Sequence, residues 1–138
     1  MNKNKIKILI VEDSPEWIKF HISLLNQLFG TDLLKIDFEM SARAGFKKII
    51  KKSETHYDLI ISDLEMEEIL EESYAGSWFV RNIIKREECK NSKILIISGS
   101  DDISLVAKEL NVDFIPKYVL SNNPMVMSYK LEELGFEI

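Results

Sequence analysis

Residues 57–66 of the chain read YDLIISDLEM, a short apolar run that stops abruptly at a carboxylate, Asp63. Three consecutive apolar residues, 59–61, are typical of a strand that is buried on both faces of a sheet. An ionised group at the end of such a strand is costly unless it is paired, solvated or bound to a cation. The sequence therefore predicts partners for Asp63, and the ends of the other apolar runs are where we expect them.

Four further segments are typical of strands. Residues 6–11 and 94–97 are continuous apolar runs, residues 112–115 form a short one, and residues 33–40 alternate between apolar and polar side chains. Continuous runs predict buried central strands, whereas alternation predicts a half-exposed strand at the edge of a sheet.

Apolar residues at helical spacing fill the intervals between these strands. The expected helices cover residues 15–29, 41–52, 78–88, 101–110 and 123–134. Ser14 and Pro15 supply an N-cap and a proline at the first helical position, and Gly30 ends the first helix. In the acidic segment 65–76 we expect at most one helical turn, followed by a turn and N-cap at residues 76–77.

Strands that alternate with helices predict right-handed βαβ units and a parallel sheet covered on both faces. Placing the alternating second strand at an edge and the continuous runs in the middle gives the strand order 2-1-3-4-5, a common doubly wound order. The predicted fold class is therefore α/β with a five-stranded doubly wound sheet. A chain of 138 residues suits one domain, residues 1–138.

Composition and charge exclude several classes of function. The net charge of −5 argues against nonspecific nucleic-acid binding, and the one lysine cluster, within residues 47–52, is best interpreted as a solvated helix end. A single cysteine, Cys89, excludes an intramolecular disulfide and fits a reducing compartment. Because neither a signal peptide nor a membrane span is recognisable, we expect a cytoplasmic protein without a membrane partner.

Polar residues follow the predicted strands at the edge where ligands bind in doubly wound sheets. Glu12 and Asp13 follow the first strand, which neighbours the strand that ends at Asp63. Two carboxylates about 4–5 Å apart repel by roughly 3–4 kcal/mol at an effective dielectric constant near 20. A few carboxylates with open water positions suit Mg²⁺ better than a calcium cage or a zinc site.

Ser98 and Lys117 follow the fourth and fifth strands and supply a hydroxyl donor and a positive charge. Acids that hold a cation, a carboxylate oxygen free to attack, and two donors for anionic oxygens describe a phosphoryl-acceptor site. In the competing interpretation, each of these residues merely caps a strand or a helix.

Four segments together resemble the motif regions of the response-regulator receiver domain, a CheY-like and flavodoxin-like fold. They are ILIVEDS at residues 8–14, LIISDLEM at 59–66, ILIISGS at 94–100 and DFIPK at 113–117. The resemblance covers nearly the whole chain. It implies that Asp63 accepts a phosphoryl group from a histidine kinase or a His-containing phosphotransfer protein.

The resemblance also assigns roles to the neighbouring residues. It implies that Mg²⁺ is held by Glu12, Asp13, Asp63 and the backbone carbonyl of Glu65. Ser98 would hydrogen-bond the phosphoryl group, Lys117 would pair with it, and Phe114 would be the switch aromatic three residues before the lysine.

The chain departs from the family pattern at several positions. Glu67 stands where the family commonly has proline, and Gly76 arrives about five residues late, so the acidic segment 65–76 is an insertion beside the site. The interval from Ser98 to Lys117 is about three residues shorter than usual. Tyr118 replaces a proline whose preceding bond the family commonly holds cis, which leaves the geometry around Lys117 open. Glu65 occupies a position that, in the family it resembles, tunes the lifetime of the phosphoryl group.

From these residues we expect a stand-alone, phosphorylation-dependent switch whose output is a protein contact. Its only chemistry would be its own phosphorylation and dephosphorylation, so it would not be an enzyme acting on other substrates. One alternative is a pseudo-receiver, an interaction module that is never phosphorylated. Another is a small Mg²⁺-dependent phosphohydrolase. A nucleotide-binding module is disfavoured because no Gly-rich phosphate loop follows the first strand.

Overall fold

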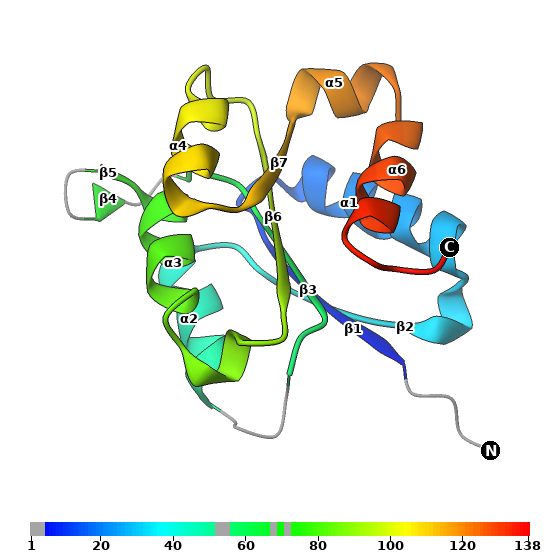
Figure 1. The fold of residues 1–138 in the computed structure, drawn as a ribbon, viewed down its shortest axis with the longest axis horizontal. Helices are drawn as coiled ribbons and strands as arrows, with labels where there is room; N and C mark the ends of the chain where they lie inside the picture. The colour runs from blue at the N-terminus through cyan, green and yellow to red at the C-terminus, as the bar shows by residue number, and fades with distance from the viewer. Residues whose placement is uncertain (1–4, 52–55, 67–68, 71–72) are drawn as a thin grey trace.

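A five-stranded parallel sheet forms the centre of the computed structural model, which describes residues 5–51, 56–66, 69–70 and 73–138. Its strands are β1 (Ile6–Val11), β2 (Leu34–Glu39), β3 (Leu59–Ser62), β6 (Lys93–Ser98) and β7 (Asp113–Pro116). They lie in the order β2-β1-β3-β6-β7 (Figure 1), which confirms the predicted doubly wound sheet. The alternating second strand is at one edge as predicted, the runs at residues 6–11, 59–61 and 94–97 are in the middle, and the short last strand β7 is at the other edge.

Helices cover both faces of the sheet (Figure 1). One face carries α2 (Ala42–Lys51), α3 (Ala75–Ile83) and α4 (Ile103–Leu110), and the other carries α1 (Pro15–Phe29), α5 (Lys117–Asn122) and α6 (Met125–Glu133). Short 3-10 turns lie at Thr31–Leu33 and Glu87–Cys89. None of the helices described is long and apolar enough to cross a membrane.

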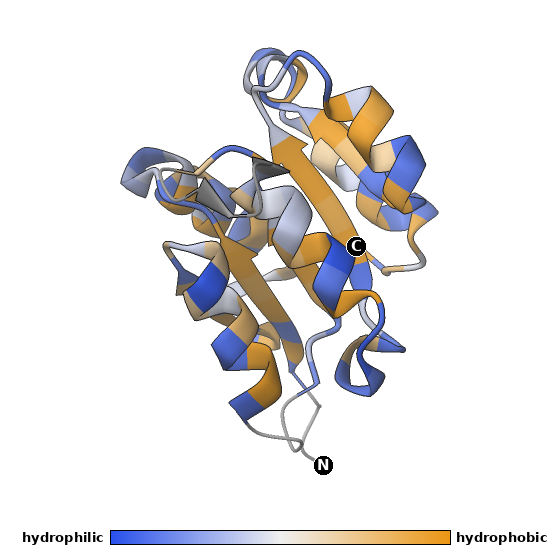
Figure 2. Ribbon diagram, turned by 90° about the vertical axis from the view of Figure 1, so that its left-hand side faces the viewer, coloured by the Kyte–Doolittle hydropathy of each residue, from blue (hydrophilic) through white to orange (hydrophobic). Residues whose placement is uncertain are grey.

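The strands supply the core on both sides, because successive side chains of a strand point to opposite faces. Leu9, Ile60 and Ile96 pack under α2, α3 and α4, whereas Ile10 and Ile61 pack under α1, α5 and α6. Figure 2 shows these strands as apolar ribbons enclosed between helices with mixed surfaces. This double burial is the physical reason why the central strands have continuous apolar sequences.

Helix α1 begins and ends as its sequence predicts. The Ser14 hydroxyl accepts a hydrogen bond from the Trp17 backbone N–H at 3.4 Å, and Pro15 is the first helical residue. Gly30 ends the helix with a φ of +91°, a conformation that residues with a side chain rarely adopt. The start of α1 is therefore fixed directly after Glu12 and Asp13.

Helix α3 differs from the prediction at both ends. It begins at Ala75 and ends at Ile83, whereas we expected residues 78–88 with a turn at 76–77. Gly76 lies inside the first turn because its backbone packs against the backbone after β3: its N–H donates to the Leu64 carbonyl at 2.9 Å. The helix stops early because the chain turns inward at Glu87–Cys89 and buries Cys89.

The acidic segment contains strands instead of the expected helical turn. β4 (Ile69–Leu70) and β5 (Ser73–Tyr74) pair antiparallel, with Ile69 opposite Tyr74. Isoleucine and tyrosine favour strands, which is consistent with this pairing. The hairpin lies outside the main sheet, at the start of α3 (Figure 1). Glu67, like Lys52 of the predicted second helix, lies outside the described residues.

The last strand and helices also differ from the prediction. β7 covers Asp113–Pro116 rather than residues 112–115, and α5 follows it directly at Lys117, a helix that we did not predict. It forms because Leu120 is buried and Val119 half-buried in the core that α1 and α6 share. The predicted last helix begins at Met125. The described residues contain no cis peptide bond, so the bond between Lys117 and Tyr118 is trans.

We predict that Gly76→Ala destabilises the fold, although alanine ordinarily stabilises a helix interior by about 1 kcal/mol relative to glycine. A Cβ at residue 76 would lie 1.8 Å from the Asp63 carbonyl oxygen, a backbone atom with no freedom to move away. The expected loss is about 1–3 kcal/mol in the free energy of unfolding, as for other overpacked sites. Urea titration measures it.

Gly45→Ala is the matched comparison within α2. A Cβ there would meet a side-chain methyl group, Val11 Cγ2, at 2.8 Å, so we expect a smaller loss. If Gly76→Ala were as stable as the wild type, the tight contact with Asp63 would be wrong.

Candidate functional site

Three carboxylates meet at the carboxyl ends of β1 and β3. The two strands are neighbours in parallel register, with Val11 opposite Ser62, so the residues that follow them are brought together. Glu12, Asp13 and Asp63 each offer an oxygen, and these oxygens lie within 4.8 Å of one another. Glu12 is 1% exposed and Asp63 is 5% exposed, whereas Asp13 is half-buried. The structure thus forms the acidic cluster that the sequence predicts.

Both oxygens of Asp63 have hydrogen-bond donors. Oδ1 accepts from the backbone N–H of Leu64 at 2.7 Å and of Glu65 at 3.2 Å. Oδ2 accepts from the Lys117 ammonium at 2.8 Å. Donors of this kind hold a carboxylate in one orientation and offset the cost of burying its charge.

Glu12 is the carboxylate of the site whose ionised form is most disfavoured by its surroundings. Its Oε2 accepts from the Ser14 backbone N–H at 3.0 Å. Its buried Oε1 lies 2.8 Å from Lys117 Nζ but accepts no hydrogen bond of good geometry, so this contact is an ion pair only. Burial first, and then the charge of Asp63, raise the pKa of Glu12 to about 7 against the lowering effect of Lys117.

Lys117 lies between these two carboxylates, with a side chain that is only 15% exposed. Burial alone would lower its pKa, but the contacts with Asp63 and Glu12 outweigh burial and raise the pKa above its usual value. The ammonium is therefore held charged inside the site. Lys117 is the first residue of α5, and the peptide bond that joins it to Tyr118 is trans.

Ser98 and Phe114 lie on the β6 and β7 side of the site. Ser98 is fully buried, and its hydroxyl oxygen accepts from the Ser100 backbone N–H at 3.2 Å. Phe114 is half-buried against the core under α4. Both residues line one surface cavity of about 360 Å³, together with Tyr118. The structure brings the two predicted switch residues together, and their roles stay predictions.

Two residues of α1 that the sequence analysis did not single out also belong to the site. The Trp17 ring faces the Lys117 ammonium at 5.0 Å from the ring centroid. His21, one helical turn further on, is 1% exposed and packs against Trp17 at 5.6 Å between ring centroids. The available signal was an aromatic residue in the first turn of the helix that directly follows the acidic pair.

The donor set of the acidic cluster fits a hard divalent cation. All of its ligand atoms are carboxylate oxygens, and one of them, Glu12 Oε1, is buried and pairs with the Lys117 ammonium without a hydrogen bond of good geometry. Mg²⁺ and similar cations bind such oxygens and keep several waters. The backbone of Glu65 borders Asp63 through its N–H, and the predicted role of its carbonyl as a ligand stays a prediction.

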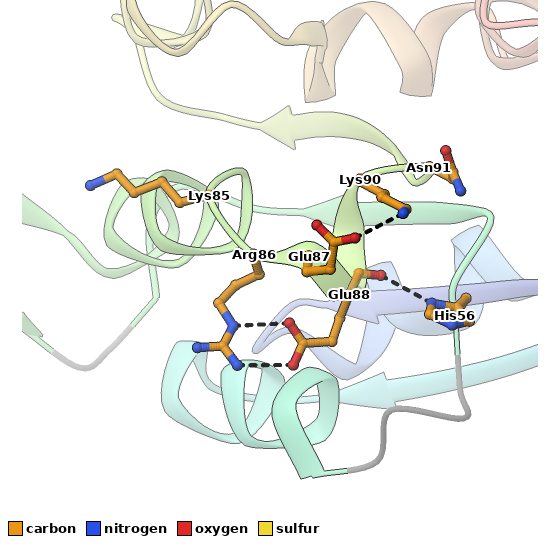
Figure 3. A pocket seen from close by; sticks show the side chains of 7 residues that line it. All are labelled: His56, Lys85, Arg86, Glu87, Glu88, Lys90 and Asn91. Atoms are coloured by element: carbon orange, nitrogen blue, oxygen red, sulfur yellow. Dashed lines mark hydrogen bonds and ion pairs between the residues drawn. The ribbon is translucent and has the colours of Figure 1, made fainter.

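A separate hollow of about 600 Å³ lies at the amino ends of β3 and β6, away from the acidic cluster (Figure 3). Its charged side chains are largely engaged with one another. Arg86 pairs with Glu88 at 2.9 Å, Lys90 pairs with Glu87 at 2.8 Å, and His56 meets the Glu88 backbone carbonyl. These pairs are exposed or half-exposed, and such ion pairs contribute little to stability. The hollow contains none of the predicted site residues.

The strand order and the acidic edge define a doubly wound α/β domain with a site at the topological switch point. Within that class, the chain has the CheY-like receiver fold. A putative response regulator from Chloroflexus aurantiacus matches it with a TM-score of 0.74 at 18% identity, covering 94% of this chain and 97% of that one.

Two further solved structures have this fold. Chemotaxis protein CheY4 of Vibrio cholerae matches with a TM-score of 0.72 at 20% identity, over 94% of this chain and 98% of its own. The Mn²⁺-bound form of response regulator Rcp1 matches with a TM-score of 0.62 at 18% identity, over 80% of each chain. No protein-family model and no curated protein matches the sequence.

We predict that His21 makes the protein acid-sensitive. Burial, and next the charge of Lys117, lower its pKa to about 4, against the raising effect of Asp63. The unfolded chain binds this proton from a pH near 6.5, so stability is complete above that pH and falls as pH drops from 6.5 to 4. Relative to His21→Leu, the wild type should lose about 3 kcal/mol over this range.

Urea titrations at several pH values measure this difference. The matched comparison is His56→Gln, which removes the exposed histidine instead of the buried one. Parallel curves for the wild type and His21→Leu would contradict the burial of a neutral histidine.

Proposed function

We propose that this protein is a response-regulator receiver that accepts a phosphoryl group on Asp63 with the help of a divalent cation, Mg²⁺ in the cell. The observation that carries the proposal is the Asp63 carboxylate, set between two further acids and a buried ammonium at the carboxyl edge of a receiver fold. If Glu12 and Asp63 merely capped strands or helices, they would not both need the buried Lys117 ammonium.

In the proposed step, one carboxylate oxygen of Asp63 attacks the phosphorus of the donor. The donor is the phosphohistidine of a kinase or phosphotransfer protein, or a small acyl phosphate. The bond from phosphorus to the donor nitrogen or oxygen breaks, and the leaving group keeps its electron pair. The product is an acyl phosphate on Asp63. The backbone N–H donors of Leu64 and Glu65 orient the carboxylate for this attack.

The neighbouring side chains would stabilise the charge of the transferring group. Lys117 moves from the Asp63 oxygen to a phosphoryl oxygen, and Ser98 donates its hydroxyl hydrogen to another. Glu12, Asp13 and Asp63 would hold the cation, which when bound neutralises the negative charge of the carboxylates and the phosphoryl group. Rcp1, a response regulator with the same fold, has been solved with Mn²⁺ bound, which supports a cation in this type of domain.

The modified protein would act as a switch and not as an enzyme on other substrates. Phosphorylation adds about −1.5 to −2 charges next to Ser98 and Lys117. Ser98 lines one cavity together with Phe114 and Tyr118, and Lys117 directly precedes Tyr118 in α5, so a new partner for either residue would reach this surface. We propose that a downstream protein binds the rearranged surface, in a cytoplasmic two-component pathway.

We predict that the wild type is modified once when incubated with acetyl phosphate and Mg²⁺. Asp63→Asn should not be modified, because an amide oxygen is a poor nucleophile at phosphorus. Excess EDTA should abolish the reaction of the wild type, since the acids then repel the donor. Intact-mass spectrometry after a short incubation measures the product, and beryllium fluoride provides a non-covalent test of the same site.

The matched control is Asp113→Asn, which removes an acid that pairs with Lys130 at 3.3 Å on the surface. Its modification should equal that of the wild type. A folded wild type that neither binds Mg²⁺ nor becomes modified would overturn the proposal in favour of a pseudo-receiver. Steady release of phosphate from unrelated phosphomonoesters would favour a phosphohydrolase.

A further inference from the structure

We propose that Trp17 is a positioning residue for Lys117: its ring holds the ammonium in the site by a cation–π contact. This inference rests on the proposed phosphoryl-acceptor function, and it adds a residue that none of the sequence motifs contains. The Lys117 ammonium has three N–H donors that can take up partners.

Two directions around the Lys117 ammonium are taken by carboxylates. Asp63 Oδ2 and Glu12 Oε1 each lie 2.8 Å from Nζ. The indole ring of Trp17 lies beside the same nitrogen, with its centroid at 5.0 Å. A cation within about 6 Å of an aromatic centroid is attracted by the negative face of the ring, and tryptophan is the strongest partner. The attraction increases when the contact is shielded from water, as it is for a side chain that is 15% exposed.

The ring itself is fixed from two sides. Phe20 contacts it edge-on at 5.2 Å between centroids, and His21 packs against it at 5.6 Å. The pKa of His21 is lowered, so its imidazole stays neutral and adds no positive charge that would repel the ammonium. The backbone of Trp17 is anchored in turn by the Ser14 cap, and the Ser14 N–H donates to Glu12.

The consequence concerns what happens when the carboxylates change partners. A cation held by Glu12 and Asp63, or a phosphoryl group on Asp63, would engage the carboxylate oxygens that pair with Lys117 in the unmodified protein. Trp17 contacts Lys117 without being a ligand of either group. It therefore keeps the ammonium within reach of the phosphoryl oxygens when the two ion pairs are lost.

The test measures the affinity for beryllium fluoride in the presence of saturating Mg²⁺. Trp17→Leu should weaken this affinity about 2- to 30-fold, the range that cation–π energies span. Trp17→Phe keeps an aromatic face and should recover much of the loss. The affinity for Mg²⁺ alone should not fall in either variant, because Trp17 contacts no carboxylate of the cluster. General damage to the fold would weaken both ligands together.

Trp78→Leu is the matched control. Trp78 is the second of the two tryptophans and packs edge-on against Phe46 of α2, at 5.5 Å between centroids. Its removal should leave the affinity for beryllium fluoride unchanged in the folded protein.

NMR provides a readout that needs no modification of Asp63. The ring current of Trp17 should shift the side-chain methylene protons of Lys117 upfield. The shift should disappear in Trp17→Leu and persist in Trp78→Leu. Its absence from the wild type would overturn the contact.

The outcomes separate the two proposals. If the wild type fails to bind beryllium fluoride, the phosphoryl-acceptor function is wrong, and the role proposed for Trp17 is wrong as well. If the wild type binds normally and Trp17→Leu binds equally well, only the role of Trp17 is wrong. Equal losses in Trp17→Leu and Trp17→Phe would likewise show that the aromatic face is not what positions Lys117.

Discussion

The burial of two carboxylates beside a single ammonium is the constraint around which this fold is arranged. Glu12 and Asp63 are nearly inaccessible to solvent, and each would be costly to ionise there without a counter-charge. Lys117, which follows β7 at the same carboxyl edge of the sheet, supplies that counter-charge. Three chain segments, after β1, β3 and β7, must therefore converge at one point. The observed strand order makes β1 and β3 neighbours and places β7 two strands from β3, beyond β6.

The sequence predicts correctly those parts of the fold in which each side chain is either fully buried or clearly exposed. The central strands are buried on both faces, so their sequences are continuously apolar, and the half-exposed β2 alternates. Asp63 could be located because a strand of this kind ends at it. Glu12, Asp13 and Lys117 could be placed beside it because parallel strands deliver their carboxyl ends to one edge. The sequence thus predicted the positions of these charges, although not which oxygen each one contacts.

The parts that the sequence did not predict depend on contacts between distant segments. A glycine such as Gly76 is typical of a turn, yet Gly76 lies in a helix. It is a glycine because the backbone of residues 63–64 leaves no room for a side chain there. α5 is short and is stabilised by the core that it shares with α1 and α6. Trp17 was missed for a related reason. Its helix is recognised from apolar spacing, whereas its contact with Lys117 joins residues that are far apart in the chain.

The contact of Gly76 with the Asp63–Leu64 backbone has a consequence for how such a domain can diversify. The peptide hydrogen bond from Gly76 to Leu64 closes the base of the segment that contains the β4–β5 hairpin. Residues between the two anchor points can then be added or replaced without moving the Asp63 carboxylate. Gly76 is therefore the point at which the acidic segment rejoins the part of the chain that positions Asp63.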